Sequence, residues 1–220
     1  MANIQIPITE NGTTTLATAG KYCDRNIEVN VNVNGATNDR YEEGKQAEYD
    51  RLWDALQQKG SRTHYAYAFA YTGWSEDIFN PKYPITPAST LGIQNMFNWN
   101  PGVVDTKVAI TAYGNCSNAF GNATKLKRTH IIFNGATNVA NMFLNCTALE
   151  ELYCEGELTL SLSLAQSNLL NATSVQSVID CLADLTGQTA QTLTLHATVG
   201  ANLTQAQKDA ISAKNWTLVY

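Results

Sequence analysis

Few of the residue types that usually form catalytic or metal-binding sites have the sequence spacing that such sites need. The three histidines, His64, His130 and His196, lack the HExxH and CxxH spacings of zinc sites. The adjacent acids Glu150 and Glu151 would point to opposite faces of a strand, so they are poor partners for paired-carboxylate hydrolysis. No GxSxG, Walker A or GxGxxG motif occurs. The sequence therefore predicts a protein that is not an enzyme, with no cofactor and no metal site.

The five cysteines form an odd set without CxxC spacing. Cys116, Cys146 and Cys154 fall among the apolar residues of a repeated stretch, where cysteine acts as a small hydrophobe. A thiol in an apolar setting is unreactive, so Cys154 and His130 are not expected to form a nucleophilic pair. We therefore expect reduced, buried thiols.

Aromatic residues are dense between positions 65 and 83. They are Tyr65, Tyr67, Phe69, Tyr71, Trp74, Phe79 and Tyr83. Because aromatic faces stack on sugar rings and cations, Tyr67, Tyr71 and Trp74 are candidate ligand-binding residues. The alternative is that this stretch covers the open end of a stack of repeats. The sequence leaves both interpretations open.

The elements around these residues follow a phrase that recurs every 23 residues. The phrase is Asn95-Met96-Phe97, then Asn118-Ala119-Phe120, then Asn141-Met142-Phe143. Flanking residues, mostly apolar, keep the same phase; they are Ile93, Cys116, Val139, Val103, Leu126, Leu149, Val108, Ile131 and Cys154. A period in the twenties indicates one supersecondary unit per repeat, which buries its apolar edge only by stacking on its neighbours.

Two sets of residues follow from this period. The predicted repeat core contains Phe97, Phe120, Phe143, Val139, Leu126 and Leu149. The predicted structural ladder contains Asn95, Asn118 and Asn141, whose side-chain amides would pair with backbone groups left unsatisfied at the bend. Short strands are expected around 103–110, 126–133 and 149–154, with the Asn-x-Phe phrase in the turn or short helix opposite.

Beyond residue 172 the pattern lengthens. It predicts a helix over 174–185 capped by Thr173, followed by a strand at 193–195. The capping box that begins at Thr204 opens a last helix, which runs to about Lys214. A final strand over 216–220 would place Trp216 and Tyr220 over the last open face of the core.

The first part of the chain is different in character. Residues 3–34 alternate apolar and polar side chains around an Asn11-Gly12 hairpin turn, which predicts β-structure. A helix is expected over 39–59, with an apolar stripe formed by Tyr49, Leu52, Trp53 and Leu56. That stripe would dock on the protein's own core or form a short bundle between copies.

Together these patterns predict an α+β fold. We expect a leucine-rich-repeat-like right-handed solenoid with a helical and aromatic N-terminal cap and a small β-rich N-terminal segment. The expected domains are a β-rich attachment or oligomerisation segment over 1–35, a helix and aromatic cap region over 36–88, and the solenoid with helical C-terminal units over 89–220.

The repeats resemble a known family. Asn95–Val108, Asn118–Ile131 and Asn141–Cys154 resemble the BspA-like bacterial leucine-rich repeats. The tail over 174–220 looks like the closing units of such proteins in gut Firmicutes and their prophages. The segments over 8–13 and 29–33 are similar to N-terminal segments of phage tail and baseplate-associated proteins. The resemblance implies a surface-type repeat protein encoded by a phage or prophage.

Composition narrows the partners. A net charge of −5 disfavours nucleic acid, and no apolar run is long enough to span a bilayer. The sequence and the resemblance together favour a non-enzymatic structural or binding module of a virion tail or fibre. It would present its repeats to a protein or a cell-surface glycan and form a homo-oligomer, such as a trimer, through its N-terminal region.

Without a visible signal peptide, we expect synthesis in the cytoplasm and release by lysis, to the virion or the cell exterior. The alternative is a bacterial leucine-rich-repeat adhesin or protein-interaction scaffold outside any virion.

Overall fold

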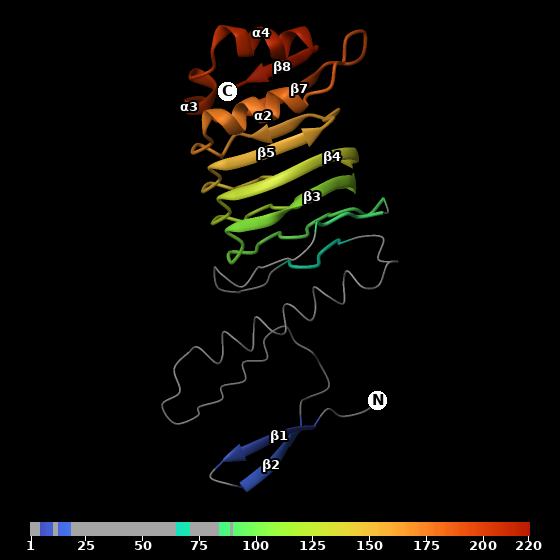
Figure 1. Ribbon diagram of the computed structural model, residues 1–220, viewed down its shortest axis with the longest axis vertical. Coiled ribbons are helices and arrows are strands. Elements are labelled where there is room, and N and C mark those ends of the chain that lie inside the picture. The colour runs from blue at the N-terminus through green and yellow to red at the C-terminus, as the bar shows by residue number, and fades with distance from the viewer. Residues whose placement is uncertain (1–4, 11–12, 19–64, 71–83, 89) are drawn as a thin grey trace. The chain divides into compact units, whose positions relative to one another are not determined.

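The computed structural model describes residues 5–10, 13–18, 65–70, 84–88 and 90–220 (Figure 1). The chain divides into two compact units, Met1–Asp39 and Arg40–Tyr220. The helix predicted over 39–59, the alternating stretch over 27–33, and residues Tyr71 and Trp74 lie outside the described residues. The predicted domain boundaries at 35 and 88 stay predictions.

The first unit contains an antiparallel pair of strands. β1 (Gln5–Glu10) pairs with β2 (Thr13–Thr18), and Glu10 lies opposite Thr13. Threonine and isoleucine are enriched in this segment, and such β-branched residues favour extended backbone. The predicted hairpin strands are therefore confirmed.

The described residues of the second unit include a parallel sheet in the order β3-β4-β5 (Figure 1). Its strands are β3 (Asp105–Asn115), β4 (Arg128–Asn138) and β5 (Glu151–Gly156). Residues 23 positions apart stand side by side, as Arg128 does with Asp105 and with Glu151. Ile85 adds an isolated bridge to Ile110 at the β3 edge. Each sequence repeat therefore advances the chain by one strand.

The recurring phenylalanines form one buried column. Phe97 and Phe120 stack with ring centroids 5.3 Å apart, and Phe120 and Phe143 with centroids 5.4 Å apart. Phe69 joins the column, 5.4 Å from Phe97. The other predicted core residues, Val139, Leu126 and Leu149, are also buried. Such stacked rings contribute about 0.5–1.5 kcal/mol per pair beyond the area they bury.

Phe69 identifies a layer that the sequence period did not predict. The backbone N–H groups of Tyr65, Tyr67 and Phe69 donate to the carbonyl oxygens of residues 92, 94 and 96 at 2.8–2.9 Å. The N–H groups of Asn95 and Phe97 make the equivalent bonds one layer later, at 2.9 and 2.7 Å. Tyr65-Ala66-Tyr67-Ala68-Phe69 is therefore a degenerate copy of the repeated phrase.

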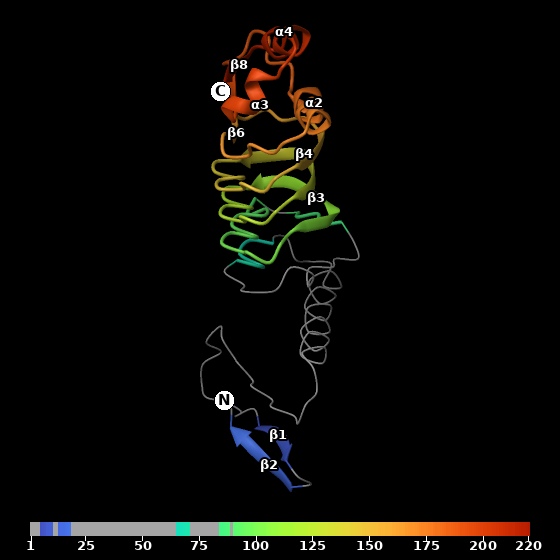
Figure 2. The ribbon, with the colours of Figure 1, turned by 90° about the vertical axis from the view of Figure 1, so that its left-hand side faces the viewer.

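The segments that return from one strand to the next contain turns with asparagine in the left-handed region. Asn95, Asn118 and Asn141 have φ of 52°, 52° and 55°. Asparagine tolerates this conformation better than most residues, which explains its fixed position in the phrase. Figure 2 shows these return segments on one side of the stack and the strands on the other.

The side-chain amide ladder lies mainly at other asparagines than those predicted. Asn145 Nδ2 donates to Asn122 Oδ1 at 2.7 Å, and Asn122 Nδ2 lies 3.4 Å from Asn98 Oδ1. Asn98 Nδ2 in turn donates to Asn95 Oδ1 at 3.1 Å. For Asn118 and Asn141, the structure shows a backbone role: each occupies a left-handed position.

The predicted fold class is wrong. In place of a leucine-rich-repeat-like right-handed solenoid with a helical and aromatic N-terminal cap, the described residues form two small three-stranded parallel sheets, β3-β4-β5 and β6-β7-β8, with few helices. The return segments around the phenylalanine column are turns. The aromatic residues at 65–69 form a layer of the stack itself.

The first sheet ends at β5 because a helix takes the place of a fourth strand. This helix, α2 (Ala172–Cys181), packs beside β5. Ser174 Oγ accepts a hydrogen bond from the N–H of Leu152 at 2.9 Å, and Ser177 Oγ accepts one from the N–H of Cys154 at 2.6 Å. Ser177 Oγ also lies 3.0 Å from the Cys154 carbonyl oxygen. Two serines three residues apart thus form hydrogen bonds with the backbone at the edge of the sheet that α2 covers.

The second sheet has the order β6-β7-β8 and is also parallel. Its strands are β6 (Leu162–Leu164), β7 (Gln191–Leu195) and β8 (Trp216–Val219). The helix α3 (Ala197–Ala201) follows β7. The predicted final strand and the predicted strand at 193–195 are therefore confirmed, although they belong to a sheet separate from the first.

The helix ends test the predicted caps. Asn171, not Thr173, caps α2, since its side chain accepts from the N–H of Ser174 at 2.9 Å. The last helix, α4 (Gln205–Ala213), begins with the predicted capping box at Thr204. Trp216 is buried and donates from Nε1 to the Ala183 carbonyl oxygen at 2.9 Å, whereas half of Tyr220 is exposed.

Candidate binding groove

The predicted aromatic ligand site is only partly described. Tyr67 is 57% exposed and has a φ of 58°, at the position that Asn95 occupies one layer later. Its neighbours Tyr65 and Phe69 are buried in the stack. Burial raises the pKa of the Tyr65 hydroxyl. The described part of this stretch thus contributes one exposed ring, and two rings to the core.

A groove opens on another face, where the strands of the first sheet begin. It has a volume of about 600 Å³. We call it the sheet groove; it is lined by Asp105, Thr106, Lys107, Val108, Ala109, Arg128, Thr129, His130, Glu151, Leu152, Tyr153, Asn171, Thr173 and Ser174. The lining residues come from all three strands and from the first turn of α2. The groove therefore crosses the strands.

An irregularity of β3 shapes one end of the groove. Asp105 pairs with Arg128 and Ala109 with His130, so three residues of β3 lie opposite Thr129 alone. Lys107, in the middle of the three, has a φ of 55°, and its N–H donates to Asp105 Oδ1 at 2.7 Å. Such bulges bend a strand and redirect its side chains.

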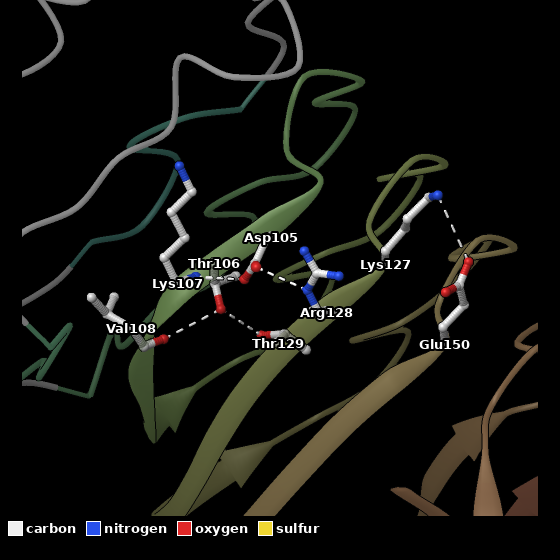
Figure 3. A network of polar contacts seen from close by, with 8 residues as sticks. All are labelled: Asp105, Thr106, Lys107, Val108, Lys127, Arg128, Thr129 and Glu150. Carbon is white, nitrogen blue, oxygen red and sulfur yellow. Dashed lines mark hydrogen bonds and ion pairs between the residues drawn. The ribbon is translucent and has the colours of Figure 1, made fainter.

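Hydroxyl and charged groups form a network of polar contacts at the β3 end of the groove, as Figure 3 shows. The Thr106 hydroxyl lies 3.1 Å from the Thr129 hydroxyl and 3.3 Å from the Val108 carbonyl oxygen. Arg128 Nε donates to Asp105 Oδ2 at 2.9 Å. This hydrogen bond, and the charge of Asp105, raise the pKa of the Arg128 guanidinium. An exposed pair of this kind adds at most about 1 kcal/mol of stability, but it orients both side chains.

A second ion pair lies beside the groove. Lys127 Nζ is 3.8 Å from Glu150 Oε1, and these two residues immediately precede β4 and β5 (Figure 3). The exposed pair repeats the pattern of Asp105 and Arg128 one layer further along. The beginnings of the three strands thus carry charges of both signs rather than a patch of one sign.

Tyr153 forms the aromatic side of the groove. It is 52% exposed, and its ring meets the His130 ring edge-on at a centroid distance of 4.7 Å. A hydrogen bond to the Glu155 carboxylate raises the pKa of its hydroxyl. His130 Nε2 lies 3.5 Å from Glu155 Oε1 without a hydrogen bond of good geometry. The Tyr153 ring is therefore in contact with His130 while about half of its surface stays exposed.

The thiols stand apart from this groove. Cys116, Cys146, Cys154 and Cys181 are unpaired and buried. Burial raises the pKa of Cys116 and of Cys146 to about 12. The hydrogen bond that the Cys154 thiol shares with Cys181 and, after it, burial raise the pKa of Cys154. Protonated thiols of this kind are poor nucleophiles.

Two further findings concern the described residues as a whole. No group of three or more histidine, cysteine, aspartate or glutamate side chains among them is placed to hold a metal ion. None of the helices in this part of the chain is both long and apolar enough to cross a bilayer.

The chain matches no protein-family model, no curated protein and no solved structure. The resemblance of its repeats to BspA-like sequences therefore stays a prediction.

We did not predict the sheet groove from the sequence, although a signal was present. The 23-residue period that aligns the phenylalanines also aligns polar residues on the strands. Arg128 follows Asp105 by 23 residues, and Tyr153 follows His130 by the same step. Following the polar columns as well as the apolar ones would have placed these side chains together.

Proposed function

We propose that the protein is a non-enzymatic structural and binding module of a phage or prophage virion, part of its tail or fibre. It presents the outer face of the β3-β4-β5 sheet to a protein or glycan partner. The observation that carries the proposal is the sheet groove, an open depression whose polar and aromatic residues are held in place by neighbouring layers.

The division of the chain supports an attachment role for its first part. The β1–β2 hairpin belongs to a compact unit, Met1–Asp39, distinct from the unit that carries the groove. A small unit of this size has too little core to be very stable alone, so association with other copies or with another virion protein would stabilise it. Several copies on one particle would also strengthen weak individual contacts through effective concentration. A trimer is the expected assembly.

Location follows from the same proposal. The chain would be made in the cytoplasm, assembled into particles and released by lysis. Binding to a partner would occur at the exterior of the bacterial cell.

Particle composition tests the proposal. Particles induced from the strain that carries the gene, purified on a density gradient, should contain this chain in a fixed ratio to the other particle proteins by mass spectrometry. Light scattering of the purified chain should give the mass of a trimer. Recovery of the chain only from the surface of uninduced cells, as a monomer, would contradict the proposal and favour an adhesin or scaffold outside any virion.

A further inference from the structure

The sheet groove has the dimensions of a ligand site. Its volume of about 600 Å³ falls in the range of small-molecule sites in proteins. Neighbouring strands lie about 4.8 Å apart, so the distance from β3 to β5 is roughly 10 Å, and the first turn of α2 extends the groove further. An extended ligand with more than one ring would therefore fit better than a single small ion.

The charges that line the groove balance one another. The carboxylates of Asp105 and Glu151 stand against the cations of Lys107 and Arg128. Asp105 and Arg128 are joined by a 2.9 Å hydrogen bond, so much of their charge is already compensated. A strongly anionic or cationic ligand would gain from one half of these groups and be opposed by the other half. A neutral ligand with many hydrogen-bonding groups suits them all.

The aromatic side of the groove favours the same ligand class. The face of an aromatic ring carries a negative quadrupole, which attracts the weakly positive C–H groups on the flat side of a sugar ring. Tyr153 is half exposed, and its T-shaped contact with the His130 ring restricts its motion. A ring that is already fixed loses little entropy when a ligand stacks on it.

We infer that the sheet groove binds a neutral oligosaccharide, with Tyr153 as the stacking surface and Asp105, Arg128 and Glu151 as hydrogen-bonding partners of its hydroxyl groups. This inference rests on the proposed function and selects glycan over protein as the partner. It also moves the sugar site away from Tyr67, where the aromatic-rich stretch had suggested it.

The test uses the full chain on an array of neutral and acidic oligosaccharides, followed by calorimetry with the best neutral compound. Tyr153→Ala should weaken binding at least about tenfold, and Tyr153→Phe, which keeps the ring, should retain most of it. Tyr67→Asn is the matched control. It removes an exposed ring and installs the residue found at the same position in later layers, so its binding should be unchanged.

The outcomes separate the inference from the proposed function. Loss of sugar binding in Tyr67→Asn but not in Tyr153→Ala would overturn the groove as the site while leaving glycan binding in place. Binding of acidic glycans alone would contradict the inference that the ligand is neutral. An array without any binding would overturn the inference altogether, whereas the proposed function would still be decided by the composition of purified particles.

Discussion

The serines that close the β5 edge make a quantitative prediction. Replacing Ser174 and Ser177 together by alanine removes the acceptors of two buried N–H groups, those of Leu152 and Cys154. Leaving a buried donor unsatisfied costs about 1–3 kcal/mol, so the two sites should cost roughly 2–6 kcal/mol. Alanine is the better helix former by up to about 0.7 kcal/mol per site. The net loss of unfolding free energy should therefore be about 1–5 kcal/mol.

Urea unfolding followed by circular dichroism measures this loss. Ser212→Ala is the matched control, because Ser212 is an exposed serine of α4 and should show only the small gain in helix propensity. Amide hydrogen exchange should also become faster at Leu152 and Cys154, which lose their acceptors. A double variant as stable as the original protein, with unchanged exchange at both amides, would refute the view that α2 closes this edge.

Three further predictions concern the core and the turns. Phe120→Ala should lower the unfolding free energy by about 3–5 kcal/mol, since Phe120 is fully buried between two stacked rings; a loss below about 1 kcal/mol in urea would contradict the column. Trp99→Asn should raise the free energy of unfolding by about 1 kcal/mol, because Trp99 is exposed and has a φ of 56°, a conformation that asparagine tolerates better than tryptophan. A lower free energy of unfolding would contradict this and show that the tryptophan ring contributes packing. Cys116 and Cys146 keep their protons in the folded state up to a pH of about 12, whereas in the unfolded state they ionise near pH 9. Each thiol should therefore reduce stability by about 1.4 kcal/mol per pH unit as the pH rises through this window. Between pH 9 and pH 12, the free energy of unfolding of Cys146→Ala should fall less steeply with pH than that of the original protein. An unchanged slope would contradict the effect of burial on this thiol.

The sequence period revealed the core because apolar side chains are the strongest constraint on a stacked layer. Phe97, Phe120 and Phe143 are fixed in phase since each must lie over the next. Phe69 escaped detection because it precedes Phe97 by 28 residues instead of 23, and because Tyr67 replaces the asparagine of the phrase. Insertions in a loop leave the stack intact but remove the period that reveals it.

The prediction of the fold class was wrong for a different reason. Apolar residues beyond position 172 keep the phase of the earlier repeats, which suggested one continuous structure. What ends the first sheet is the pair of hydroxyls at Ser174 and Ser177, and serine carries no signal of hydrophobic periodicity. The return segments were predicted as turns or short helices, and they are turns. Their left-handed positions, such as Asn95 and Asn122, do not occur inside a regular right-handed helix.

The sheet groove depends on relations that no single stretch of sequence contains. Its residues come from three strands and a helix, and they meet only after the layers stack. The bulge around Lys107 arises from two extra residues in β3, which the apolar pattern could not reveal. The charge pairs could have been found from the period, but their open surface could not.

Hydrogen–deuterium exchange with and without a neutral oligosaccharide selected on the array tests the central claim most directly. The claim is that the outer face of the β3-β4-β5 sheet is the binding surface. It predicts slower exchange, on adding the sugar at saturating concentration, in the segments 105–109, 128–130 and 151–153, with residues 65–70 unchanged. Protection confined to 65–70, or bound sugar without protection in the three strand segments, would contradict it.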